Sequence, residues 1–465
     1  MGTIFLHQLQ DHLKSLRLQI SLVVVLVLFA ANGMTYVWKY ERLAKNTPHV
    51  NADVKRRYDQ VEKVNDLVGR FYRIMSDRLP TEFMTEGGAN WFGDAFYLNP
   101  ETGSSMFYSG RSRSSNHWMR RYEVADWTLI VRLVLSFLCI VLAYDAVSGE
   151  MESGTLRLLM ANSLARGQVL LGKYLAYLVV LLLVTLLGSL VSLLILSLNG
   201  TVQLNGEVMR GYFMFLLGTA LYVSLFLFLA MGISTVARNS ATSLVLLILA
   251  WAVLIVVIPQ TSYLVGTQSV EVDSDWKGMS FQHLGEVRQN LSEEGLVLRQ
   301  RELAQRDDFA QEKRYALRLN AAEKEARRIL QDGYDKALRQ YRIARTVNML
   351  SPGFAFQYAV EAFLATGLQR YQHFERQAWR YYDGLRDFIR TRDAADADSP
   401  HVLFVRGYMS DREMDSNNIP RFGLERLPLA NSVRAGVVPI AVLVLEVLLA
   451  FFFALWAFNR ADISG

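Results

Sequence analysis

Six long runs of apolar residues divide this chain, and each run is close to the length that crosses a membrane. A run of that length with few charges predicts a membrane-spanning helix. We expect spans over residues 18–38, 127–144, 169–198, 212–236, 241–258 and 435–458. An aromatic belt of Tyr36, Trp38 and Tyr40 closes the first span, and Pro259 is expected to end the fifth. The pattern predicts a mostly α-helical, polytopic membrane protein.

The residues ahead of the first span, 1–17, are expected to form a helix that lies in the membrane interface. Phe5, Leu9, Leu13 and Leu16 fall on one side of that helix, and polar residues fall on another. A cleavable signal peptide is the alternative. The apolar run that follows is too long for the apolar part of a signal peptide, and no A-x-A cleavage site comes after it. We therefore expect the first span to be retained.

The first long polar stretch, residues 39–126, is expected to form a small mixed domain. Apolar residues recur there at spacings of three and four from Val54 to Met75, which predicts an amphipathic helix over 52–77. Pro80, the pair Gly87 and Gly88, and the serine-rich stretch 109–115 then indicate turns and loops.

The second long polar stretch, residues 259–433, is expected to be mainly helical. Its apolar residues from Tyr315 to Tyr341 recur at near-heptad spacing, and acidic residues precede basic ones by four positions. This pattern predicts long helices, which could pair as an antiparallel hairpin. Ser351, Pro352 and Gly353 interrupt the helical pattern, and an amphipathic, aromatic-rich pattern resumes over 356–388.

The basic residues near the spans predict the orientation of the chain. Cytoplasmic flanks of membrane proteins are enriched in lysine and arginine. One side of the six expected spans carries Lys14, Arg17, Arg157, Arg166, Lys173, Arg238 and Arg460. The short connection 199–211 on the other side carries only Arg210. Both termini are therefore expected in the cytoplasm, and both long polar stretches are expected outside it.

Composition excludes several classes of function. Of the 465 residues, 52% are hydrophobic and 20% are charged, so a wholly soluble protein is not expected. The formal net charge of +5 is spread without any basic block, which argues against nucleic-acid binding. The only cysteine, Cys139, lies in an apolar run, so no intrachain disulfide can form. The seven histidines have no spacing typical of a metal site, and no resident cofactor is expected.

Catalysis by this chain is not expected either. Residues 167–173 match the first seven positions of a phosphate-binding loop, but Tyr174 replaces the required hydroxyl residue and no strand precedes the motif. A membrane-embedded enzyme would need polar residues clustered deep within the spans. Only Glu446 stands out there, since Arg132 lies nearer the end of its span. Glu446 could take part in transport, or it could simply form a hydrogen bond with a neighbouring helix.

The polar stretch between the second and third spans carries a resemblance to a known family. It contains S-G-E-M-E-S-G-T-L from Ser148 to Leu156, and then Leu158, Leu159, Arg166 and the pair Gly172 and Lys173. This order resembles the signature of the first cytoplasmic loop in type-2 ABC exporter permeases. The six spans and the N-terminal interfacial helix agree with that family. Leu350, Ser351 and Pro352 with the helix that follows resemble, more loosely, a subgroup with large extracytoplasmic inserts, which includes permeases of gliding and multi-copper-enzyme-maturation systems.

The resemblance implies a role for residues 145–168, which we name the coupling segment. In that family this loop forms the coupling helix that docks on a cytoplasmic ABC ATPase dimer, where ATP and Mg²⁺ are bound. The matching positions are Asp145, Gly149, Glu150, Glu152, Gly154, Thr155, Leu156 and Arg166. The resemblance also implies a second permease subunit, identical or paralogous, and a place in the bacterial cytoplasmic (inner) membrane. The alternative for this segment is an ordinary interfacial loop, because a helix in a partner's groove and a helix on lipid share one pattern.

Two functions of different classes remain open at this point. The first is export from the cytoplasm or the inner leaflet, driven by ATP that a partner hydrolyses. The second is mechanical transmission or scaffolding, in which the outer helices act on a periplasmic partner and no substrate crosses. The Leu-, Val- and Ile-rich second and fifth spans favour a lipid-like or amphipathic cargo, although surfaces that face lipid have the same composition.

Overall fold

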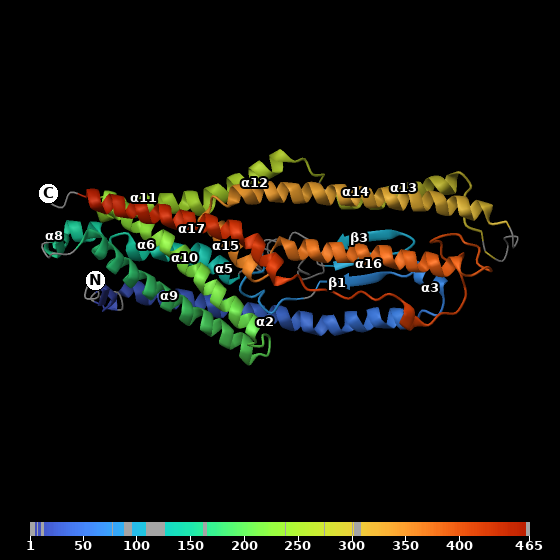
Figure 1. Cartoon of the computed structure of the whole chain (residues 1–465), viewed down its shortest axis with the longest axis horizontal. Coiled ribbons are helices and arrows are strands. Elements are labelled where there is room, and N and C mark those ends of the chain that lie inside the picture. The colour runs from blue at the N-terminus through green and yellow to red at the C-terminus, as the bar shows by residue number, and fades with distance from the viewer. Residues whose placement is uncertain are drawn as a thin grey trace.

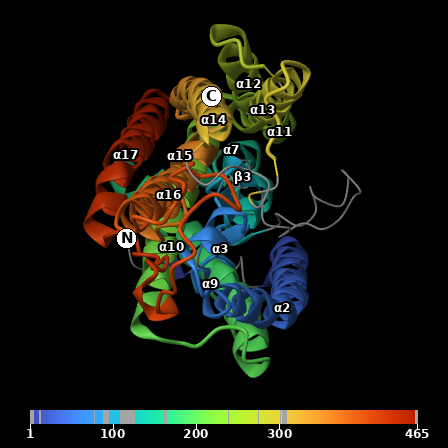
Figure 2. The ribbon, with the colours of Figure 1, turned by 90° about the vertical axis from the view of Figure 1, so that its right-hand side faces the viewer.

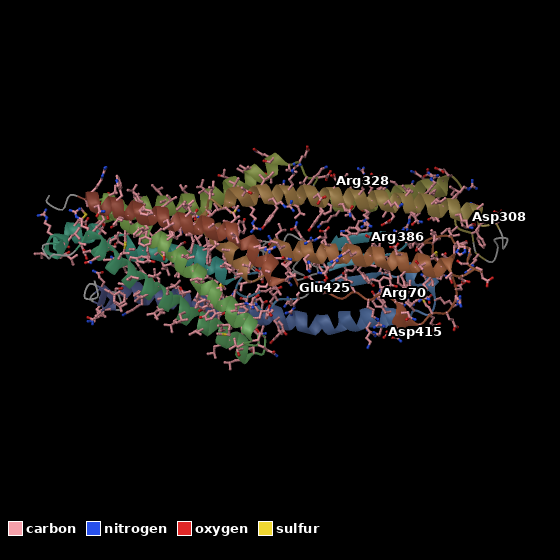
Figure 3. All side chains as sticks on the ribbon, viewed as in Figure 1. Arg70, Asp308, Arg328, Arg386, Asp415 and Glu425 are labelled. Atoms are coloured by element: carbon pink, nitrogen blue, oxygen red, sulfur yellow. The ribbon has the colours of Figure 1, made fainter. Side chains whose placement is uncertain are left out.

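The apolar helices gather at one end of an elongated molecule, and the charged helices and a small sheet gather at the other (Figure 1). The structure is a computed structural model that describes residues 5–6, 8–10, 14–76, 78–87, 95–107, 126–160, 165–237, 239–273, 275–299, 301 and 308–461. Arg70, Asp308, Arg328, Arg386, Asp415 and Glu425 all lie in the polar half (Figure 3). The molecule therefore has a membrane half and a polar half.

Among the residues that the structure describes, six helical stretches are long and apolar enough to cross a membrane, which confirms the mostly α-helical, polytopic fold. They are Leu16–Glu41, Trp127–Glu152, Arg166–Leu198, Gly206–Ala237, Ser240–Ser269 and Leu429–Arg460. The first is part of α2 (Leu16–Asp59), and the third, fourth and sixth are α9 (Arg166–Leu198), α10 (Gly206–Ala237) and α17 (Leu429–Arg460). Part of the interfacial helix expected over 1–17 lies outside the described residues. Within that range, residues 5–6 and 8–10 are described and are helical.

The second and fifth spans each contain a π-helical segment. The second consists of α5 (Trp127–Leu129), a π-helical segment (Ile130–Leu135) and α6 (Ser136–Ala143). The fifth consists of α11 (Ser240–Ala252), a π-helical segment (Val253–Val257) and α12 (Ile258–Ser269). The prediction that Pro259 ends the fifth span was wrong. The wider π turn shifts the hydrogen-bond register just before the proline, so the helix continues although Pro259 has no N–H.

The predicted helix over 52–77 was also wrong. Helix α2 ends at Asp59, a short α3 (Val64–Val68) follows, and the chain then enters strand β1 (Tyr72–Met75). Strands β2 (Ala95–Asn99) and β3 (Gly103–Phe107) complete an antiparallel sheet of order β1-β2-β3, with Tyr72 opposite Leu98 and Phe96 opposite Met106. The chain from the end of α2 through α3 buries Tyr58, Val61, Val64 and Val68 as the helical spacing predicts, but β1 buries Tyr72 and Ile74 and leaves Phe71 56% exposed.

The second polar stretch contains the long helices that were expected. They are α13 (Trp276–Glu293), α14 (Ala310–Asn348), α15 (Pro352–Phe363) and α16 (Leu368–Ala394), followed by a 3₁₀ turn (Ser416–Asn418). Helices α13 and α14 are antiparallel, because Trp276 packs on Gly333 while Glu294 pairs with Arg318. Viewed from the polar end, α2, α14 and α17 lie around the periphery, and α15 and α16 lie among them (Figure 2).

Helix α15 packs among the membrane helices. Its Phe356 ring stacks on Tyr222 of α10, with the ring centroids 5.0 Å apart. Gln357 accepts a 2.6 Å hydrogen bond from Arg132 Nη1, and a Cβ on Gly353 would come within 2.6 Å of Arg132 Cγ. The insert expected over 259–433 is therefore not separate from the bundle, since α12 extends the fifth span and α15 returns to it.

A second apolar core holds the polar half together. The end of α2, α3, the sheet and α16 meet there and bury Tyr58, Val64, Phe96 and Tyr382. The two polar stretches are also joined by an ion pair at 2.6 Å between Arg370 and Glu82, whose side chains are only 9% and 6% exposed. The polar half is thus one packed unit made from both stretches.

Candidate coupling site

The coupling segment folds into two short helices at the end of the molecule where the chain termini lie (Figure 1). These helices are α7 (Ser148–Glu152) and α8 (Thr155–Met160), and residues 161–164 lie outside the described part. Gly154, between them, has a φ of +73°, a left-handed conformation that glycine adopts without strain. A Cβ there would meet no atom within 4 Å, so the backbone conformation, and not space, favours glycine.

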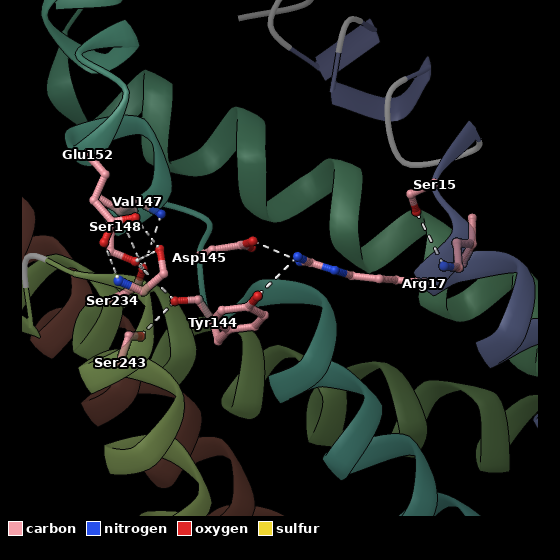
Figure 4. A network of polar contacts seen from close by, with 11 residues as sticks. Ser15, Arg17, Tyr144, Asp145, Val147, Ser148, Glu152, Ser234 and Ser243 are labelled. Carbon is pink, nitrogen blue, oxygen red and sulfur yellow. Dashed lines mark hydrogen bonds and ion pairs between the residues drawn. The ribbon is translucent and has the colours of Figure 1, made fainter.

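The start of the segment is tied to the first span. Arg17 of α2 donates a 2.7 Å hydrogen bond from Nη1 to Asp145 Oδ2, and another of 3.0 Å from Nη2 to the Tyr144 hydroxyl (Figure 4). The guanidinium carbon also lies 5.0 Å from the centre of the Tyr144 ring. One arginine therefore holds two consecutive residues by charge, hydrogen bonds and a cation–π contact.

Serines of the fourth and fifth spans hold the backbone where α6 ends. Ser234 Oγ accepts hydrogen bonds from the N–H groups of Val147, at 3.2 Å, and Ser148, at 3.0 Å (Figure 4). Ser243 Oγ donates a 2.6 Å hydrogen bond to the Tyr144 carbonyl oxygen. These contacts satisfy polar backbone groups that the end of a helix leaves without intrahelical partners.

Sequence reasoning missed both of these serines. The only available signal was a small hydroxyl residue in the last turn of one span and the first turn of the next. That signal is weak, because serine is tolerated in many membrane helices through a hydrogen bond to its own backbone.

Glu150 is bound inside the molecule. Its Oε1 lies 2.5 Å from Lys173 Nζ of α9, and it accepts a 3.3 Å hydrogen bond from Gln8 Nε2. Lys173 is 1% exposed and also donates a 2.8 Å hydrogen bond to the Ala146 carbonyl oxygen. Residues 167–173, which imitate a phosphate-binding loop, form the first turns of α9, and their lysine serves this internal pair.

Glu152 caps the fifth span. Its two carboxylate oxygens accept hydrogen bonds of 2.9 Å from the Ser240 N–H and 2.9 Å from Ser240 Oγ. Ser240 is the first residue of α11, where unpaired N–H groups and the helix dipole favour a negative charge. Glu152 therefore links α7 to a helix almost ninety residues further along the chain.

The structure brings seven of the eight predicted coupling residues together in α7, α8 and the adjoining turns. Leu156 is 1% exposed, Thr155 Oγ1 donates a 3.4 Å hydrogen bond to the Glu150 carbonyl oxygen, and a Cβ on Gly149 would lie 3.3 Å from Asp145 Cβ. Arg166 lies apart from them, where its Nη1 donates a 2.7 Å hydrogen bond to the Asn459 carbonyl oxygen at the end of α17. The side chain of Leu158 is 73% exposed.

Glu446 lies far from this segment, in the middle of α17. Its Oε2 is buried and has no hydrogen-bond partner among the residues that the structure describes. Arg132, the other charged residue considered in the spans, contacts Gln357 and the Phe354 ring. The two charged residues are not paired with each other, but both lie near Tyr222 of α10, whose hydroxyl donates a 2.7 Å hydrogen bond to the Arg132 carbonyl oxygen.

Six spans and a polar segment tied to four of them define a polytopic membrane protein with a firmly held surface at one membrane face. A family model described as "ABC-2 family transporter protein" matches residues 3–463, so this chain belongs to that family.

Two curated relatives carry the name "Probable ABC transporter permease protein NosY". The one from Pseudomonas aeruginosa is 37% identical over 122 residues, which is 26% of this chain and 44% of that protein. The one from Stutzerimonas stutzeri is 40% identical over 65 residues, which is 14% of this chain and 24% of that protein. The matched segments thus span less than half of either relative.

Replacing Lys173 by Met is expected to destabilise the protein. The Glu150 carboxylate would then stay largely buried without its cation, and removing one partner of a buried pair costs about 3 kcal/mol or more. Thermal and denaturant unfolding in detergent would measure the loss. The double variant Lys173→Met/Glu150→Leu should recover part of it.

The matched control is Lys336→Met, which breaks an exposed pair with Asp332. That change should cost well under about 1 kcal/mol. Equal losses in the Lys173 and Lys336 variants would contradict the role assigned to the buried pair.

Proposed function

We propose that this chain is the membrane subunit of an ABC exporter and that the coupling segment receives the movement of a separate cytoplasmic ATPase dimer. ATP and Mg²⁺ would bind in that partner. The observation that carries the proposal is the attachment of one short segment to four spans: Arg17 of the first, Lys173 of the third, Ser234 of the fourth and Ser240 of the fifth.

These attachments make the segment suited to passing on a force. A displaced loop moves a helix only if the contacts between them resist separation. Here the contacts combine charge-assisted and backbone hydrogen bonds, which are among the stronger non-covalent links in proteins. We infer that Asp145, Glu150 and Glu152 act in coupling by holding the segment to the spans, because each carboxylate already has a partner within the chain.

The surface that we assign to the ATPase is the exposed side of α8. Leu158 is 73% exposed there, next to the exposed Arg157. A short helix with an apolar side chain at its centre fits a groove in a partner protein. Contact with the lipid interface is the alternative for the same side chain.

The substitution Leu158→Arg is expected to reduce the amount of ATPase that co-purifies with the tagged protein by about tenfold, because a central apolar contact contributes most to such an interface. Leu317→Arg is the matched control, since Leu317 is 70% exposed on α14 in the other half of the molecule. The control should retain the ATPase. Normal recovery with Leu158→Arg would exclude α8 as the docking surface.

The orientation and assembly follow from charge and exposure. Arg17 binds Asp145 of the coupling segment, Arg157 belongs to α8, and Arg166 binds the end of α17. These basic residues favour a cytoplasmic location for the end that carries the coupling segment and for both termini. The inner membrane of a bacterium is then the proposed location, with the polar half on its periplasmic side, as in the subgroup with large extracytoplasmic inserts. There it would cap the exit or bind a periplasmic partner.

We also propose that two permease subunits enclose the path. In the fifth and sixth spans, only 17% and 22% of the most apolar stretch is buried against the rest of the chain. Their remaining apolar surface is available for a second subunit, identical or paralogous, or for lipid.

Within the spans, we propose that Glu446 faces the transport path, because a carboxylate without a partner is costly in lipid and favours a polar cavity. Glu446→Gln keeps the shape and removes the charge. It is expected to slow ATP-dependent movement of a fluorescent phospholipid analogue in proteoliposomes by about tenfold or more. Glu325→Gln, a matched change on the polar half, should have no effect. Unchanged movement in both variants would exclude Glu446 from the path.

A second candidate function, mechanical transmission to the outside, is favoured by the fifth span. Its helix continues from Ser240 to Ser269, and its first residue is bound to Glu152 of the coupling segment. At the other end, Gly266 packs so closely on α14 that an added Cβ would lie 2.8 Å from Ala344 Cβ. Helix α14 then runs 39 residues along the polar half. A movement at Glu152 therefore has a continuous helical route to the far end.

The substitution Gly266→Leu is expected to force α12 away from α14 and to break this route. Spin labels at Leu317→Cys and Asp415→Cys, in a Cys139→Ala background, would report ATP-dependent distance changes in the complex with the ATPase. Gly266→Leu should abolish such a change, and Gly285→Leu should not, because a side chain there meets no atom within 4 Å. The absence of any ATP-dependent change in the labelled parent would exclude mechanical transmission.

A further inference from the structure

A cleft of about 990 Å³ opens between α14, α16 and the first turns of α17. Its walls include Tyr334, Arg376, Trp379, Arg380, Asn431 and Arg434. Asn431 and Arg434 belong to the helix that forms the sixth span, whereas the other four belong to the polar half. The cleft thus lies where the polar half meets the membrane bundle.

The cleft is positively charged on balance. Arg376, Arg380 and Arg434 line it together with two acids, Asp335 and Glu375. Glu375 accepts a 3.1 Å hydrogen bond from the Trp379 indole, and burial raises the pKa of its carboxyl to about 7. Glu375 is therefore only partly ionised at neutral pH, which leaves the arginines in excess.

Two of the arginines are available to a ligand. In the described ranges, neither Arg380 nor Arg434 has an ion-pair or hydrogen-bond partner, and Arg376 donates its Nε to the Gln372 carbonyl oxygen four residues earlier. Guanidinium groups bind phosphate oxygens in pairs of parallel hydrogen bonds. Three guanidinium groups around one cleft favour a phosphate, which has several acceptor oxygens, over an anion that accepts at a single atom.

The depth of Arg434 places the cleft at the level of lipid headgroups. Helices α10 and α17 run in the same direction, because Glu207 at the start of α10 pairs with Arg426 just ahead of α17, and Gly232 lies against Phe453. Arg434 is therefore close to the level at which α10 enters the membrane. Lysine and arginine at such a level reach the lipid phosphates.

An exposed apolar stripe continues from Arg434 along the lipid-spanning part of α17. Val438, Leu445, Leu449 and Phe452 follow on the same face of the helix, with exposed fractions of 57%, 56%, 61% and 60%. A molecule with a phosphate in the cleft would have room for acyl chains along this stripe.

We propose that this cleft binds a phospholipid of the adjacent leaflet, with its phosphate held by Arg376, Arg380 and Arg434 and its acyl chains along the exposed face of α17. The site requires only that the chain lies in a membrane, so it holds whether the transporter exports a substrate or transmits force. The aromatic wall of Trp379 and Tyr334 suits the glycerol region, where polar and apolar groups meet.

The experiment measures lipid binding to the purified full-length chain by native mass spectrometry, with phosphatidylglycerol titrated into detergent. The double variant Arg380→Gln/Arg434→Gln is expected to bind about tenfold more weakly or worse, because two charge-assisted contacts are lost. Arg328→Gln is the control, since Arg328 is an exposed arginine on α14 that pairs with Glu325. Both variants change surface residues and should unfold at the parent's temperature.

Four outcomes would overturn the proposal. Equal weakening by Arg328→Gln would indicate unspecific surface charge. Inorganic phosphate that displaces the lipid at equal concentration would indicate a site for a free anion. Equally tight binding of uncharged diacylglycerol would assign the affinity to the apolar stripe alone. A dimer of the chain that excludes the lipid would mean that a second copy covers this face.

Discussion

Every backbone group that leaves the helical hydrogen-bond pattern at the membrane edge needs another partner, because lipid supplies none. The turn between α6 and α7 meets this requirement with serine hydroxyls of the fourth and fifth spans, which bind the backbone at Tyr144, Val147 and Ser148. The same contacts hold the coupling segment against the bundle. A requirement of hydrogen bonding thus attaches this segment to the helices of the fourth and fifth spans.

The charges of the segment extend this attachment to the other spans. Lys173, which is almost completely buried, needs the Glu150 carboxylate and the Ala146 carbonyl oxygen to remain charged in apolar surroundings. Glu152 has a different role, since it accepts hydrogen bonds from the N–H and hydroxyl groups of Ser240 at the N-terminus of α11. Acidic residues that resemble a docking surface in the sequence are therefore bound within the chain itself, and the partner surface that we propose lies on α8 instead.

Some elements were predictable from the sequence, and others were not. Length and apolarity predict the six spans well, because the thickness of the lipid requires an apolar run of about the same length in every helix that crosses it. The polar half is harder to predict. Tyr58, Val61, Val64 and Val68 have the spacing of a single helix although they belong to two helices and the residues between them, and the strand that follows buries Tyr72 instead of Phe71. The π-helical segment ahead of Pro259 has no sequence signal of its own. The resemblance predicted eight coupling residues, but no sequence signal identified Arg17, Ser234 and Ser240 as the groups that bind this segment.

The sequence by itself determined the membrane class of the protein and its six candidate spans, because these depend on local composition and length. The coupling segment was predicted from its resemblance to a family signature. Only the tertiary structure decided which groups meet. It paired Glu150 with Lys173, returned α15 to the bundle, and opened the arginine cleft beside α17. These contacts join residues that are distant along the chain, and their geometry depends on how the helices pack together, which no local pattern encodes.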